Sequence, residues 1–234
     1  MTALLATTGP ALAQDMTFSL GDGGALSARL IQIFLLITLL SIAPGIAIMV
    51  TCFPFMVTTL SILRQAIGLQ AAPPNMMIVS LALFLTYFVM EPVFSTAWTN
   101  GVQPLIDGDL SDAQAFDQIM GPFVQFMTAR VDTGTLDAMQ ALAPDRAPAE
   151  GEPTPLSVLV PSFMLSEIQR AFEVGFMIFL PFLVIDLVVA SVLMAMGMMM
   201  VPPAVVSLPF KLAFFVMADG WTLLAGALVT GYST

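Results

Sequence analysis

The stretch FEVGFMIFLPFLVIDLVVASVLMAMGMMM, Phe172–Met200, decides the fold class, because it is almost entirely apolar and carries only two charged residues, Glu173 and Asp186. Three more apolar runs accompany it, and they lie between Arg29 and Arg64, from Met76 to Phe94 and from Ala204 to Val229. A bilayer core of about 30 Å takes about 20 helical residues. The sequence therefore predicts four helical segments of membrane length.

The amino-acid composition also indicates a helical membrane protein. The chain has 234 residues, is 58% hydrophobic and only 9% charged, whereas soluble domains are roughly 25% charged. A net charge of −10 leaves no basic surface for phosphates, so nucleic acid is excluded as a partner. With no histidine and a single cysteine, Cys52, zinc sites, histidine-ligated haem, Ser-His-Asp triads and Cys-His dyads lack their parts. We expect no metal, no cofactor and no enzymatic activity.

The N-terminus resembles a secretory signal. Residues 1–13 end in Ala11-Leu12-Ala13, a small-x-small pattern that predicts cleavage between Ala13 and Gln14. The alternative is an ordinary flexible tail, since no basic residue precedes the short apolar stretch. If this stretch is a secretory signal, the N-terminus of the mature chain lies outside the cytoplasm.

The remaining chain divides into three regions. We expect a first helical hairpin region at 14–94, an acidic extracytoplasmic loop at 95–165 and a second helical hairpin region with a Met-rich turn at 166–234. The connection from Arg64 to Asn75 carries a positive charge and no acid, which favours the cytoplasmic side. The predicted fold is all-α, a polytopic helical membrane-type protein of broken helical hairpins with an extracytoplasmic, part-helical loop.

Local patterns give detail within the loop. Ser111 and Gln114 match a capping box, and apolar residues at helical spacing follow, with a bend or restart expected at Gly121-Pro122. A second short helix is expected at Thr135–Leu142 and a flexible linker at Pro144–Pro155.

Prolines interrupt the apolar runs. We expect a hairpin broken near Pro44-Gly45, or else one long span with an extension. Further breaks are expected at Pro54, Pro181, Pro202-Pro203 and Pro209. In lipid, broken helices are tolerated where neighbouring protein satisfies the freed backbone groups, so these segments suit a helical assembly.

Two sets of residues could carry function. Met198, Met199 and Met200 lie one residue before Pro202-Pro203. Flexible thioethers there could seal a hole and repack around whatever passes; the alternative is an apolar helix end. The second set consists of ionisable residues in the apolar runs, which need partners because a charge in hydrocarbon is costly: Glu91, Glu167, Arg170, Glu173, Asp186, Lys211 and Asp219.

Lys211 is the only cation after Arg170. Its partner could be Glu167, Glu173, Asp186 or Asp219, within one chain or across a subunit boundary. Structural pairing is the favoured interpretation. A proton relay and an aspartyl dyad of Asp186 and Asp219, as in an intramembrane protease, remain as alternatives.

Two long blocks, Leu60–Phe94 and Ser166–Trp221, resemble the FliP family of type III export gate proteins. The resemblance implies a pore-forming scaffold subunit in the bacterial inner membrane and flagellar basal body, which passes unfolded protein substrates. It also implies five copies assembled with FliQ-like and FliR-like subunits and further export-gate proteins, in a conical gate raised out of the bilayer.

The resemblance assigns roles to residues as well. Met198, Met199 and Met200 match a pore gasket, while Glu167 and Lys211 match charged contacts between subunits. A flagellum and an injectisome remain equally open as the system served. The competing functions are a small-solute secondary transporter, suggested by broken helices and buried charges, and the intramembrane aspartyl protease.

Overall fold

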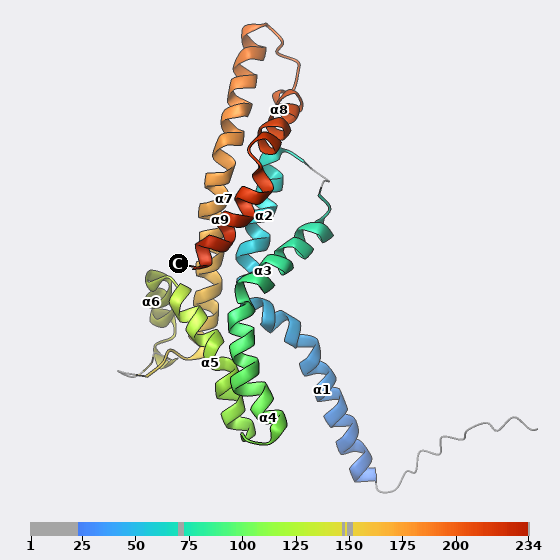
Figure 1. The fold of residues 1–234 in the computed structure, drawn as a ribbon, viewed down its shortest axis with the longest axis vertical. Coiled ribbons are helices and arrows are strands. Elements are labelled where there is room, and N and C mark those ends of the chain that lie inside the picture. The colour runs from blue at the N-terminus through green and yellow to red at the C-terminus, as the bar shows by residue number, and fades with distance from the viewer. Residues whose placement is uncertain (1–22, 70–72, 147, 149–151, 234) are drawn as a thin grey trace, which may run out of the picture. The chain divides into compact units, whose positions relative to one another are not determined.

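The computed structural model describes residues 23–69, 73–146, 148 and 152–233, and within them every regular element is helical (Figure 1). The predicted all-α fold is confirmed. The chain divides into two units, residues 1–44 and 45–234. The expected signal peptide with its cleavage site at Ala13 and Gln14 lies outside the described residues.

Helix α1 (Gly23–Met49) supplies the described part of the first unit and passes through Pro44 without a break. The expected break near Pro44-Gly45 is therefore wrong, since the helix ends only at Met49 and α2 begins at Phe53. Pro44 removes one backbone donor from the helix, and the helix continues on both sides of it. Side chains from Arg29 to Pro44 are exposed, and Thr38 and Ser41 donate to carbonyls of their own helix.

Helix α2 (Phe53–Ile67) is the centre of the second unit. Its buried side chains recur at spacings of three and four residues, and it packs against α3 (Asn75–Ala97), α7 (Leu156–Ala195) and α8 (Pro203–Met217). Pro54 lies in its first turn, where no backbone donor is needed. Gly68, with φ of +89°, ends it in a left-handed cap.

The acidic region is more helical than expected. Helix α3 continues through a π-helical turn, Trp98–Val102, into α4 (Gln103–Asp107). Helix α5 (Asp112–Arg130) begins at the predicted capping box, where the Ser111 backbone donates to Gln114 Oε1 at 3.2 Å. It runs through Gly121-Pro122 without the expected restart.

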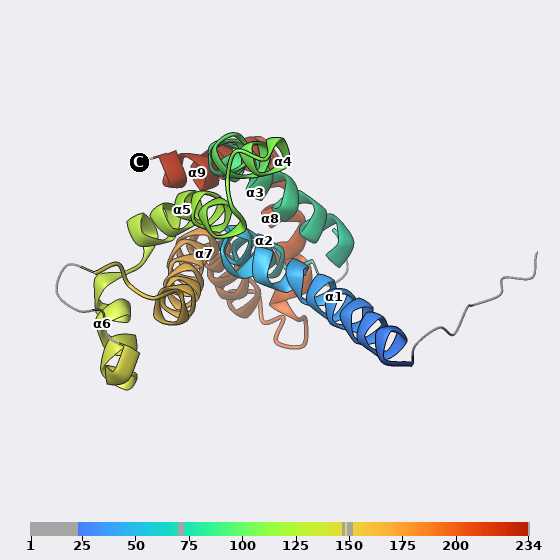
Figure 2. The same cartoon turned by 90° about the horizontal axis from the view of Figure 1, so that it is seen from below.

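The second predicted loop helix is also present. Helix α6 (Thr133–Leu142) packs against α7 (Figure 2). Asp132 caps it by accepting from the Thr135 backbone at 2.8 Å, and this bond holds the pKa of Asp132 below its ordinary value. Of the expected linker at Pro144–Pro155, Pro144–Arg146 forms a short 3-10 turn, and residues 147 and 149–151 lie outside the described residues.

Helix α7 spans 40 residues and contains Pro161 and Pro181, so its length is about 60 Å at 1.5 Å per residue. Helix α8 contains Pro209 and is followed, after a 63° bend, by α9 (Gly220–Ser233). Pro181 and Pro209 therefore do not break their helices. The bend lies at Ala218-Asp219, where Asp219 has φ of +48°.

Membrane-length helices match the predicted segments in number. Arg29–Met49, Asn75–Asp107 and Leu156–Ala195 are each long and apolar enough to span a bilayer, and the bent pair of α8 and α9 makes a fourth if the two helices together form one span. The boundaries differ from the expected ones because helix continues beyond the apolar residues at Phe94 and before Phe172.

Gly175 allows α7 to approach α2 closely, because a Cβ at this position would overlap the Ile62 side chain. We expect Gly175→Leu to destabilise the fold by about 1–3 kcal/mol, the typical cost of overpacking. Thermal unfolding in detergent measures the effect. Gly226→Leu is the matched control, since no atom lies within 4 Å of a Cβ there. Equal stability of both variants would contradict a tight α2–α7 contact.

Candidate functional site

The Met-rich turn joins α7 to α8 at the tip of their hairpin (Figure 1). Helix α7 ends because Gly197 adopts φ of +76°, and the backbone of Met198 then donates to the Leu193 carbonyl at 2.9 Å. Met198, Met199 and Met200 are 42%, 84% and 98% exposed. The turn therefore presents soft apolar side chains outward, as a non-helical loop would.

An ion pair between a buried lysine and a partly exposed aspartate lies below this turn. Lys211 Nζ on α8 is 2.7 Å from Asp186 Oδ2 on α7 and donates to the Ala66 carbonyl at 3.0 Å. Ser207 Oγ donates to Asp186 Oδ1 at 2.6 Å. The side chain of Lys211 is 6% exposed and that of Asp186 is 35% exposed.

This arrangement joins three helices. Of the four partners considered for Lys211, the chain uses Asp186. Ala66 lies in the last turn of α2, where a cation is favoured by the helix dipole. The Lys211–Asp186 pair therefore joins α7 and α8, the two helices that flank the Met-rich turn, to the central helix α2.

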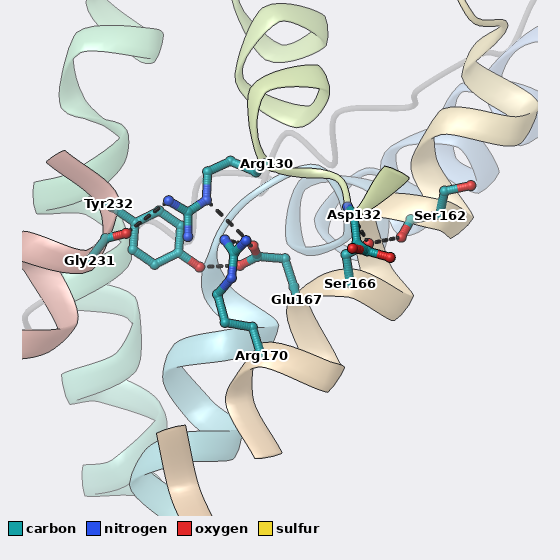
Figure 3. A network of polar contacts seen from close by, with 8 residues as sticks. All are labelled: Arg130, Asp132, Ser162, Ser166, Glu167, Arg170, Gly231 and Tyr232. Atoms are coloured by element: carbon teal, nitrogen blue, oxygen red, sulfur yellow. Dashed lines mark hydrogen bonds and ion pairs between the residues drawn. The ribbon is translucent and has the colours of Figure 1, made fainter. Parts of the chain in front are cut away.

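A second polar network surrounds Glu167, nearer the N-terminal end of α7 than Asp186 (Figure 3). Glu167 is fully buried and accepts a hydrogen bond from the Tyr232 hydroxyl. Arg130 Nε and Arg170 Nη1 each lie 3.8 Å from Glu167 Oε1. The Arg130 guanidinium stacks 4.0 Å from the centre of the Tyr232 ring and donates to the Gly231 carbonyl at 2.8 Å.

Glu167 and Lys211 have separate partners within one chain. Glu167 precedes Asp186, the partner of Lys211, by 19 residues on the same helix, a rise of about 28 Å. An intrachain contact between Glu167 and Lys211 is thereby excluded. Their pairing across a subunit boundary stays a prediction.

The other ionisable residues differ in exposure. Glu173 and Asp219 are exposed on the single chain, although the sequence grouped them with buried charges, and Asp186 is partly buried. Gln169 donates to Glu173 at 3.1 Å, and Thr222 donates to Asp219 at 3.2 Å. Asp186 and Asp219 thus bind different groups, an arrangement that gives no support to a shared aspartyl dyad. Within the described ranges, no cluster of three metal-ligating side chains occurs.

Sequence reasoning missed Arg130, Tyr232 and Ser207 as network members. No role was assigned to Arg130 from the sequence, although it is one of just two basic residues in the acidic region at 95–165. A buried carboxylate such as Glu167 needs a cation or hydrogen-bond donors nearby. This need indicated that partners exist. The sequence alone could not identify Arg130 on α5 or Tyr232 on α9 as those partners.

The FliP family model matches residues 36–228 of the chain. The chain belongs to the FliP family. Similar relatives are the flagellar biosynthetic protein FliP of Caulobacter vibrioides, 51% identical over 95% of this chain and 84% of the relative, and that of Agrobacterium fabrum, 48% identical over 98% and 96%. The FliP of Bacillus subtilis is 42% identical over 92% and 97%.

Family membership confirms the resemblance of the two sequence blocks and favours a flagellum over an injectisome. This FliP-family chain is a membrane-associated flagellar biosynthesis protein and a component of the type III export apparatus.

Proposed function

We propose that this chain is a pore-forming and scaffold subunit of the flagellar export gate, and that it passes unfolded flagellar subunits across the inner membrane. The observation that carries the proposal is the Met-rich turn, whose three side chains extend outward from the tip of a pinned hairpin. A narrow ring of such thioethers excludes hydrated ions and yields to a polypeptide.

The length of α7 supports a scaffold role. At 40 residues it is about twice as long as a bilayer core requires, so part of its apolar surface must be covered by protein. Leu183, Leu187 and Met194 are among its exposed apolar side chains. Five copies with FliQ-like and FliR-like subunits, in a gate raised from the bilayer, would supply that cover together with further export-gate proteins.

The contact between Lys211 and the Ala66 carbonyl supports the proposed orientation. It brings the end of α2, which leads into the Arg64–Asn75 connection, to the same side of the bundle as α8. In our proposal this side faces the cytoplasm, whereas the N-terminus and the acidic region are extracytoplasmic. The location is the flagellar basal body, and the role is non-enzymatic.

Cross-linking to a stalled substrate tests the proposal. We expect Met199→Cys to form a disulfide with a cysteine in an export substrate halted by a folded C-terminal fusion. Leu142→Cys, equally exposed on α6, is the matched control and should not cross-link. Burial raises the pKa of native Cys52 to about 12, so its thiol remains protonated and unreactive. Failure of Met199→Cys to react in an exporting cell would reject the pore role.

A further inference from the structure

A cavity of about 480 Å³ lies between the antiparallel helices α7 and α9, with α2 and α8 closing its sides. Arg170 and Gly231 line one end, and Pro181 and Gly220 line the other. The intervening stretch of α7 rises about 17 Å. The cavity is therefore long and narrow.

Most of the wall is apolar. The lining includes Val174, Met177 and Ile178 from α7 and Leu223 and Leu228 from α9. Such a wall favours a hydrocarbon chain, because apolar surface gains free energy when it leaves water.

The two charged residues of the lining, Arg130 and Arg170, stand together at one end (Figure 3). Arg130 is 13% exposed and Arg170 is 38% exposed at the side chain. The cavity thus combines an apolar body with a cationic end.

The cationic end is under-compensated. Both guanidinium groups share Glu167 Oε1 at 3.8 Å, beyond hydrogen-bond distance. Among the described residues, the buried Nε–H of Arg130 and the buried Glu167 Oε1 that faces it at 3.8 Å each lack a hydrogen-bond partner. The Asp132 carboxylate also interacts electrostatically with Arg170, but it is exposed to solvent and accepts hydrogen bonds from Thr135. Two cations against one buried carboxylate favour a further anion.

We propose that this cavity binds an anionic phospholipid, with its phosphate between Arg130 and Arg170 and one acyl chain along the apolar wall. Arginine suits this role because its planar donors match phosphate oxygens. Basic pockets between membrane helices bind anionic headgroups by the same chemistry. The bound lipid would fill the space between α7 and α9 and supply the missing acceptors.

Native mass spectrometry of the purified full chain in neutral detergent tests the proposal, with dioleoyl-phosphatidylglycerol and dioleoyl-phosphatidylcholine as probes. We expect phosphatidylglycerol to bind about tenfold more tightly, and Arg170→Gln to remove about that factor, the typical weight of a charged hydrogen bond. Arg146→Gln, an exposed cation outside the cavity, should change nothing.

A second variant tests the apolar wall. Ala227 is exposed and lines the cavity, so Ala227→Trp should fill it and reduce binding of phosphatidylglycerol at least severalfold without unfolding the chain. Equal affinity for the two lipids, or unchanged binding in both Arg170→Gln and Ala227→Trp, would overturn the proposal. So would binding of inorganic phosphate with no preference between the lipids.

A neighbouring chain is the competing occupant. Ala227→Cys in the assembled complex would then form a disulfide with a cysteine placed on another subunit, in high yield and at the expense of lipid. That outcome would make the cavity a subunit interface and reject the lipid site. Retained phosphatidylglycerol in the assembled complex, lost in Arg170→Gln, supports it.

Discussion

Replacing Met198, Met199 and Met200 by alanine is expected to make the closed gate leak small ions severalfold more than the native gate. Five copies of the turn would contribute about fifteen thioethers to the seal. Alanine shortens every one of these side chains, while the helices on either side keep their packing. Ion permeability of cells that produce the complete gate at matched expression measures the effect.

Assembly must remain intact for the leak to be informative. The turn contributes exposed side chains, and the helix contacts lie elsewhere, so the triple variant should still recover the native subunit composition. Met49, Met76 and Met77 are also exposed and lie outside the cavity between α7 and α9, and their triple alanine variant is the matched control. Equal permeability of the Met198–Met200 variant and the native gate, with assembly unchanged, would return the turn to an ordinary apolar connection.

Lys211→Ala is expected to lower the free energy of unfolding by about 3 kcal/mol, since removal of one partner strands the other charge. The value is at the lower end of the usual range because Asp186 is 35% exposed and solvent screens it. The change also frees the Ala66 carbonyl and loosens the hairpin from α2. Thermal unfolding of the purified chain in detergent measures it.

Two further variants separate the effect of the lost ion pair from that of the lost side-chain packing. Lys211→Met with Asp186→Leu should recover much of the loss, because a well-packed apolar pair often replaces a buried ion pair. Arg146→Ala, at an exposed position, should stay within about 0.5 kcal/mol of the native chain. Unchanged stability in Lys211→Ala would exclude the Asp186 pair as a structural element.

The same variant tests the inter-subunit role of Lys211. If Lys211 and Glu167 also make contacts between subunits, Lys211→Ala should reduce the yield of the proposed pentamer beyond what its lower stability explains. Native mass spectrometry that finds the full number of pentamers would reject that role and leave Lys211 with its intrachain partner.

Features determined by neighbouring residues were predictable from the sequence. The capping box at Ser111 starts α5. The methionine run before Pro202-Pro203 indicated a non-helical turn as one of two possibilities, and Gly197 with its positive φ forms that turn. The four membrane-length segments also follow from local hydropathy. Each of these depends on a few consecutive residues, so tertiary contacts were not needed to find it.

Proline positions show where local reasoning fails. Pro44, Pro181 and Pro209 lie inside continuous helices, although each proline removes one backbone donor. Apolar helices tolerate such prolines where neighbouring groups satisfy the freed carbonyl. The chain instead bends at Ala218-Asp219, where Asp219 takes a positive φ. Composition at that position carries no comparable signal.

The sequence by itself determined that the chain is an all-helical membrane-type protein, because hydropathy acts over short distances, and it left the methionine run as either a turn or a helix end. Tertiary structure alone decided the partners of the buried charges. Asp186 was one of four possible partners for Lys211, and Arg130 reaches the Gly231 carbonyl 101 residues away. Such contacts depend on which helices meet and in which register, and that is settled by the packing of the whole chain.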